Sequence, residues 1–217
     1  MPLHDRYPNA DVLAQRGHWD DATRQVVLDR VHNVPTYTYF DTQQRATLEA
    51  LCARILPQGH RSADRRIPIG PWIDQRCASH TTEGFRFDNM PSNELAWTWG
   101  LEGLDQTAQA RFGDLTPFRS LDDVQQDQVL EVIRAGDPPG EVWRRLPAKR
   151  WWVFVVLRQI TGIYYAHPYA WDEIGFGGPA YPRGYFALNF GAPEPWEARE
   201  APPQAPHPLT HVGDPRS

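Results

Sequence analysis

Residues 148–165 read AKRWWVFVVLRQITGIYY and hold the most apolar run of the chain. That run, Trp151–Leu157, is too short to cross a bilayer, because a spanning helix needs about 20 apolar residues. Pro147 interrupts the start of the segment and Pro168 closes it, as is typical of the two ends of a helix. Since the segment is apolar nearly all round, we predict that it forms the buried central helix of the fold.

Three earlier segments repeat apolar residues at the spacing of a helix that buries one face. They span 41–57, 92–113 and 120–136. A polar capping residue begins each segment, and proline or glycine ends it, which sets the expected helix ends. The third begins with a weak capping box made by Ser120 and Asp123. A shorter helix is expected from Pro71, because proline suits the first turn of a helix.

These elements predict a mainly α fold: a compact bundle of about five helices with an extended N-terminal arm and a long, irregular C-terminal segment rich in proline and glycine. The length of 217 residues fits one domain with extensions. After Pro168 no regular pattern is visible. The expected divisions are an extended arm (1–40), a helical domain (41–168), an aromatic docking segment (169–198) and a flexible tail (199–217).

The charge balance excludes some classes of function. Lysine and arginine number 22 against 27 aspartates and glutamates, so the formal net charge is −5. A nucleic-acid-binding domain needs a basic surface for phosphate contacts, so we expect no nucleic-acid partner. The N-terminal residues show neither a basic start before an apolar run nor a twin-arginine pair. We therefore expect a cytoplasmic protein with no direct membrane insertion.

The cysteines and histidines give no metal pattern. Cys52 and Cys77 are too few for a disulfide framework, so we expect reduced thiols, with a single disulfide as the open alternative. Together with His60 and His80 they offer four ligand-type side chains. Structural zinc sites show two tight ligand pairs, whereas only Cys77 and His80 are closely spaced. We expect no metal site.

The stretch GFGGPA, residues 175–180, matches the spacing of a dinucleotide-binding glycine loop. In such a loop a strand leads in and a helix leads out, so that backbone N–H groups face the pyrophosphate. Here a helix leads in, no helical pattern follows, and Pro179 removes one N–H group. We interpret the stretch as a glycine-rich turn that packs closely against another part of the protein, and we expect no bound cofactor in this chain.

His167 lies close in sequence to Asp172 and Glu173, and such groups can serve as a general acid and base. A histidine followed by proline is also typical of a helix end, where a positive charge is favourable. The two neighbouring acids point apart in either regular structure, so they do not form a carboxylate pair. The structural interpretation is favoured, and an acid–base role of His167 with Asp172 or Glu173 stays open as the alternative.

The stretch YYAHPYAWDEIGFGGPAYPRGY, residues 164–185, holds more aromatic side chains than an irregular loop would expose to water. Its glycines and prolines allow another backbone to approach closely, and arginine among tyrosines is typical of interface anchors. We predict a partner-docking surface, with a structural wrap around the chain's own core as an equal alternative. The candidate contact residues are Tyr169, Trp171, Phe176, Pro179, Tyr181, Arg183, Tyr185 and Trp196.

Several stretches together resemble the gluconate 2-dehydrogenase subunit 3 family. They are FDTQQRATLEALCARILPQ (40–58), GLEGLDQTAQARFG (100–113), FRSLDDVQQDQVLEVIRAG (118–136), LRQITGIYYAHPYAWDEIGFGGPAYPRGY (157–185) and EPWE (194–197). The resemblance covers roughly residues 40–198, which is most of the chain. The stretch 157–185 is the longest and the most specific of them.

The resemblance implies a non-catalytic small subunit. Members of the family pair with a large FAD-containing subunit of the glucose–methanol–choline (GMC) oxidoreductase class, which oxidises a sugar, a sugar acid or a glycoside. The small subunit helps the large one to fold, stay soluble and, in secreted systems, be exported. A periplasmic location is then the alternative, if a partner that bears a leader carries the chain. A stand-alone enzyme and a transient export or maturation chaperone are the competing interpretations.

Overall fold

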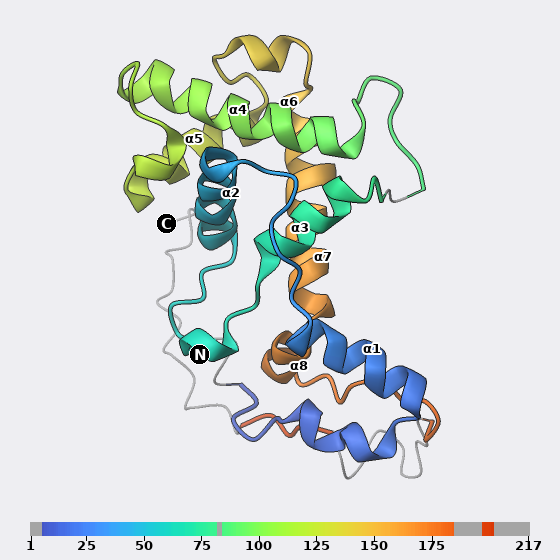
Figure 1. Ribbon diagram of the computed structural model, residues 1–217. Coiled ribbons are helices and arrows are strands. Elements are labelled where there is room, and N and C mark those ends of the chain that lie inside the picture. The colour runs from blue at the N-terminus through green and yellow to red at the C-terminus, as the bar shows by residue number, and fades with distance from the viewer. Residues whose placement is uncertain (1–5, 82–83, 185–196, 202–217) are drawn as a thin grey trace, which may run out of the picture. The chain divides into compact units, whose positions relative to one another are not determined.

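The computed structural model describes residues 6–81, 84–184 and 197–201. These residues form a mainly helical protein, and none of them lies in a strand (Figure 1). The α-helices are α1 (Asp21–His32), α2 (Thr42–Ile55), α3 (Ile69–Ala78), α4 (Asn93–Phe112), α5 (Asp123–Ala135), α6 (Ala148–Arg150), α7 (Arg158–Ala166) and α8 (Pro168–Ile174). A π-helix, η6 (Trp151–Leu157), joins α6 to α7. Short 3₁₀ helices are η2 (Val12–His18), η3 (Ala63–Arg65), η4 (Phe118–Ser120) and η5 (Glu141–Arg144).

The chain divides into two compact units. Unit 2 is the continuous stretch Leu28–His167 and holds the helices from α2 to α7. Unit 1 combines both ends of the chain, Met1–Val27 and Pro168–Ser217. The predicted mainly α fold is confirmed, and the helical domain expected at 41–168 lies almost wholly within unit 2. None of the described helices is both long and apolar enough to span a membrane.

Helix α2 begins where the sequence predicts. The Asp41 carboxylate accepts hydrogen bonds from the N–H groups of Gln43 and Gln44 at 2.8 and 2.9 Å. The Gln44 side chain accepts one in return from the Asp41 N–H group at 3.2 Å. This reciprocal capping box satisfies N–H groups that have no partner within the helix.

Helix α5 corrects one predicted cap. Asp122, and not Ser120, caps the helix, since its carboxylate accepts from the Gln125 N–H group at 2.8 Å and the Gln125 side chain accepts in return. Ser120 lies in η4, where its hydroxyl donates to the carbonyl of Pro117 at 2.8 Å. A carboxylate makes a stronger hydrogen bond than a hydroxyl, which explains why the acid holds the cap position.

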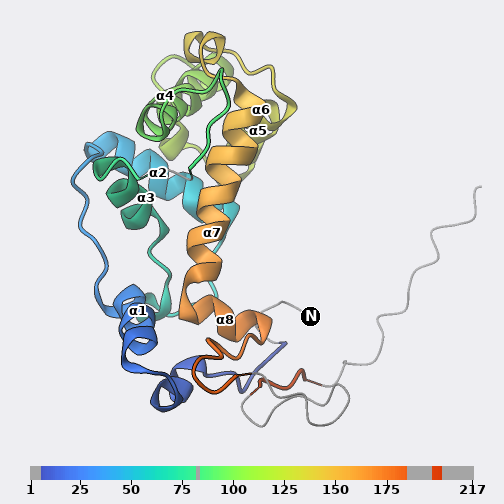
Figure 2. The same ribbon diagram turned by 90° about the vertical axis from the view of Figure 1, so that its right-hand side faces the viewer.

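The central segment forms one continuous helical rod from α6 through η6 to α7 (Figure 2). Trp151, Val155 and Val156 are buried, as predicted for a central helix. Val153 and Phe154 are exposed, which corrects the expectation that the segment is buried on all sides. A run that is apolar at every position does not reveal which side faces solvent, so the sequence left this undecided.

The N-terminal arm also differs from the prediction of an extended segment, because it contains η2 and α1. Val27 is the only buried residue of α1, so the helix has too little apolar periodicity to be found in the sequence. The carboxylate of Asp20 accepts from the Thr23 N–H group at 2.9 Å at the start of α1. Regular structure also continues beyond Pro168, since α8 begins at that residue.

The extended stretch before α2 is held by a buried acid from α3. The Asp74 carboxylate accepts hydrogen bonds from the N–H groups of Thr38 (2.7 Å), Tyr39 (3.1 Å) and Phe40 (2.8 Å). Asp74 is fully buried, so water does not compete with these N–H groups for its carboxylate. One side chain thereby fixes the chain at the entrance to α2.

Both cysteines are free and buried, which resolves the open alternative of a disulfide. Burial is the main cause that raises the pKa of the Cys77 thiol to about 12, and it also raises that of Cys52 well above its usual value. The described residues contain no group of three or more histidine, cysteine or acidic side chains placed to hold a metal ion.

Candidate partner-binding surface

Unit 1 is built around a small apolar cluster that joins the two ends of the chain. Val12 from η2, Trp19, Val27 from α1 and Trp171 from α8 are all buried in it. The Asp172 carboxylate accepts a hydrogen bond from the Val12 N–H group at 2.8 Å. Apolar burial and one charge-assisted hydrogen bond therefore hold the N-terminal arm against α8.

The glycine-rich turn after α8 packs closely on the N-terminal arm. Gly178 has φ of +82°, and a Cβ atom at this position would lie 2.6 Å from Val12. Gly175 has φ of +69°, and a Cβ atom there would lie 2.5 Å from the Tyr7 ring. Both positions need glycine for its backbone conformation and for the space. The prediction of a closely packed glycine turn is confirmed.

Two of the predicted contact residues point outward from unit 1. The side chains of Phe176 and Tyr181 are 42% and 65% exposed. The Phe176 ring contacts the buried Trp171 ring edge-to-face, with centroids 5.3 Å apart. Its backbone N–H group donates to the Trp171 carbonyl at 3.0 Å. An exposed aromatic side chain on a fixed backbone loses little conformational freedom on binding, which suits a docking anchor.

The other predicted contact residues have different surroundings. Trp171 lies in the core of unit 1 rather than on its surface. Tyr169, Pro179 and Arg183 are half-buried. Arg183 donates to the Gln15 side chain at 3.4 Å. Tyr185 and Trp196 lie outside the described residues. The aromatic segment therefore divides into a part that builds unit 1 and a part that faces outward. The structural wrap holds for Trp171, and docking stays a prediction for Phe176 and Tyr181.

His167 is buried at the end of α7, where its N–H group donates to the Tyr164 carbonyl at 3.1 Å. Burial is the largest cause that lowers its pKa to about 4, and the nearby charges of Arg61, Arg30 and Arg65 act in the same direction. The imidazole is therefore neutral at pH 7. This corrects the prediction of a favourable positive charge at the helix end, although the helix stop itself is confirmed.

The lowered pKa predicts a measurable pH dependence. In the unfolded chain the pKa of His167 is its ordinary value of 6.5, whereas in the folded protein the pKa is about 4. The unfolded state thus binds more protons between these values, and His167 lowers the stability as the pH falls through this window, by about 3 kcal/mol in all. Urea unfolding of the wild-type chain and of His167→Gln, above pH 6.5 and near pH 4, measures the difference. Equal pH dependence of the two proteins would show that His167 is not buried in its neutral form.

The alternative of an acid–base site has no support from these residues. The half-buried Asp172 accepts a backbone hydrogen bond within unit 1, and His167 is a neutral, buried group. The hydrogen bond of Asp172 was not predicted from the sequence, whereas the helix stop at His167 was. The N-terminal arm was the main omission, because Val12 and Trp19 complete the cluster under the turn. The available signal was Trp19, because a tryptophan within an otherwise polar segment indicates local burial.

Comparison with known proteins identifies the family. The family model described as gluconate 2-dehydrogenase subunit 3 matches residues 42–178, from the start of α2 to the glycine-rich turn. No curated protein and no solved structure matches the chain. The match covers more than half of the sequence and includes both α8 and Phe176, which follows that helix. The chain therefore belongs to the gluconate 2-dehydrogenase subunit 3 family and is an accessory subunit of a dehydrogenase complex.

Proposed function

We propose that this chain is the non-catalytic small subunit of a flavin-dependent sugar or glycoside dehydrogenase. Its partner is a large FAD-containing subunit of the GMC class, which carries the cofactor and the catalytic residues. The observation that carries the proposal is the outward-facing pair Phe176 and Tyr181, in a chain whose family supplies a subunit to a dehydrogenase. Aromatic side chains are enriched among the residues that dominate the binding energy of protein interfaces.

The proposed action of the chain is thermodynamic. A protein that binds the folded flavoprotein and not its unfolded form stabilises it by mass action. At a free concentration of a hundred times Kd, the gain is about 2.7 kcal/mol. The rigid turn of unit 1 suits this role, because Gly175 and Gly178 pack against the N-terminal arm and fix the backbone that carries the aromatic pair.

Co-expression with the flavoprotein encoded nearest to this chain tests the proposal, with an affinity tag on this chain only. We expect the tag to retain a yellow complex that reduces a dye when sugar is added, while this chain alone is colourless and inactive. Retention of this chain alone, beside a folded flavoprotein in the flow-through, would contradict a stable subunit and favour a transient chaperone. Sugar oxidation by the purified chain alone would favour a stand-alone enzyme.

A pair of variants tests the surface on unit 1. We expect Phe176→Ala/Tyr181→Ala to weaken binding to the flavoprotein by about 30-fold or more, as loss of an interface hot spot does. The matched control, Leu115→Ala/Val124→Ala, removes two exposed apolar side chains of unit 2 and should bind normally. Titration calorimetry gives both dissociation constants. Equal constants for the two variants would exclude this surface from the interface.

A further inference from the structure

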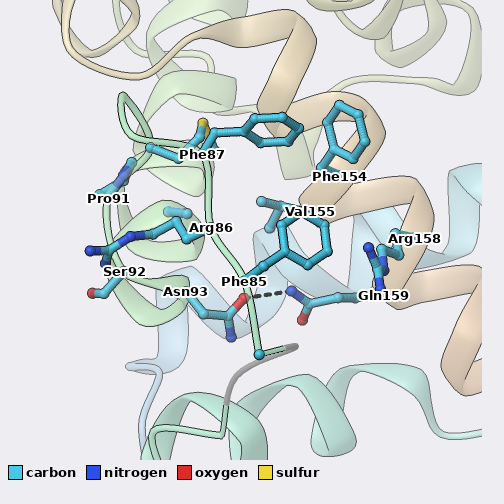
Figure 3. A pocket seen from close by; sticks show the side chains of 13 residues that line it. Phe85, Arg86, Phe87, Pro91, Ser92, Asn93, Phe154, Val155, Arg158 and Gln159 are labelled. Carbon is cyan, nitrogen blue, oxygen red and sulfur yellow. Dashed lines mark hydrogen bonds between the residues drawn. The ribbon is translucent and has the colours of Figure 1, made fainter.

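A second group of exposed aromatic side chains lies on unit 2, around a groove (Figure 3). The groove has a volume of about 300 Å³, and its lining comes from residues 84–87, 90–93, 96, 154–155 and 158–159. Phe85 and Phe154 are 58% and 39% exposed. The half-buried Phe87 contacts both of them, with ring centroids 6.0 Å from Phe85 and 4.7 Å from Phe154. A contiguous aromatic patch of this kind on a folded surface is typical of an interaction site.

The π-helix η6 creates one wall of this groove. It turns Trp151 and Val155 into the interior and leaves Val153 and Phe154 facing outward. A π-helical turn is rare, and its backbone hydrogen bonds are less favourable than those of an α-helix, so it is often found at functional sites. Here the π-helix coincides with the most apolar segment of the chain and places one of its side chains, Phe154, on the surface.

A buried hydrogen-bond network makes the base of the groove rigid. Gln159 accepts from the Trp97 indole N–H at 3.0 Å and donates to the Asn93 side chain at 2.5 Å. The second of these bonds is drawn in Figure 3. Gln159 and Trp97 are buried, and both helices that carry the network are thereby fixed. A preformed groove binds a partner without the entropic cost of ordering its walls.

The charges around the groove are positive. Arg86 and Arg158 line it, and among the described residues no aspartate or glutamate does so. The Arg158 guanidinium lies over the Phe85 ring at 5.3 Å. The Arg150 guanidinium lies over Phe87 at 4.6 Å beside the groove, where it is ion-paired with the exposed Asp88. The cationic lining contrasts with the net charge of −5 of the whole chain. A partner with carboxylates beside an apolar anchor complements such a surface, because arginine binds carboxylates through two parallel hydrogen bonds.

We propose that this groove is a second docking site for the dehydrogenase subunit. It takes a segment of that subunit in which an aromatic or large aliphatic side chain is flanked by carboxylates. The anchor fills the space between Phe85 and Phe154, and the carboxylates face Arg86 and Arg158. The inference rests on the proposed function and adds an interface on unit 2 to the one on unit 1.

The test is the affinity of the purified full-length chain for the flavoprotein, measured by titration calorimetry at low and high salt. We expect Phe85→Ala/Phe154→Ala to weaken binding at least tenfold, a loss typical of one hot spot. We expect Arg86→Glu to weaken binding at low salt and to reduce its salt dependence, since a screened attraction is removed. The controls are Leu115→Ala/Val124→Ala for apolar area and Arg66→Glu for charge reversal at an exposed site.

The outcomes separate this proposal from the proposed function. Binding of the groove variants with wild-type affinity would overturn the groove site and leave the accessory-subunit role intact. Failure of the wild-type chain itself to bind the flavoprotein would overturn both. Loss of self-association alone, seen by sedimentation, would assign the groove to a second copy and overturn the proposal. If the double alanine variant fails to unfold cooperatively, Arg86→Glu takes its place, because Arg86 is exposed and its replacement should not affect folding. Wild-type affinity and salt dependence of Arg86→Glu would then overturn the groove site.

Discussion

Replacing Asp74 with alanine should lower the free energy of unfolding by about 3–5 kcal/mol, because the N–H groups of Thr38, Tyr39 and Phe40 all lose their charged acceptor. The carboxylate binds the backbone of Thr38, Tyr39 and Phe40 from within α3, where solvent does not reach it. The variant therefore loses these hydrogen bonds and leaves the N–H group of the buried Phe40 without a partner. It should also release the extended stretch that leads into α2.

Urea unfolding followed by far-ultraviolet circular dichroism measures this change. Asp74→Asn should be less damaging than Asp74→Ala, since the amide keeps one acceptor oxygen but turns an NH₂ group toward backbone donors. The control is Asp114→Ala, which removes an exposed carboxylate and should change stability by less than about 0.5 kcal/mol. Equal stabilities of Asp74→Ala and the control would contradict the described hydrogen bonds.

Alanine at Gly100 should destabilise unit 2 by about 3 kcal/mol through overpacking. Gly100 lies on α4, and a Cβ atom there would overlap the indole ring of Trp151 in η6. Trp151 is fully buried and contacts Trp97 and Trp143, with ring centroids 6.3 and 5.4 Å away, so its ring has no free space to move into. Gly100 is thus what allows α4 to approach the central rod.

Gly162 on α7 provides the matched comparison, because no atom lies within 4 Å of a Cβ placed there. Gly162→Ala should raise stability by about 0.5–1 kcal/mol, since alanine loses less backbone entropy in a helix than glycine does. Thermal and urea unfolding of the two variants should therefore shift in opposite directions. Shifts of the same sign would show that helix propensity, and not contact with Trp151, governs both positions.

Local sequence signals were sufficient for most of unit 2. The carboxylate cap at Asp41 and the glycine stop at Gly113 both lie where the pattern places them. Such caps act within a few residues, so a single sequence contains the information. Asp74 shows the limit, since its partners are more than 30 residues away and no local pattern indicates them.

The same limit applies to the candidate surfaces. The aromatic content of residues 164–185 indicated that these side chains are either buried in the chain's own core or covered by a partner. It did not indicate which side chains belong to each group. Trp171 entered the core because Val12 and Trp19 from the other end of the chain enclose it. The groove on unit 2 was not predicted at all, because Phe85 and Phe154 are far apart in sequence and meet only after α4 and the central rod have packed.

We propose that this chain stabilises a folded flavin-bearing subunit by binding to it. The most direct test is the temperature at which the flavoprotein releases its flavin, followed by flavin fluorescence at increasing concentrations of this chain. We expect the release temperature to rise steadily with concentration above Kd, and we expect Phe176→Ala/Tyr181→Ala to require more protein for the same rise. A release temperature that stays constant at every concentration of the wild-type chain would contradict the claim.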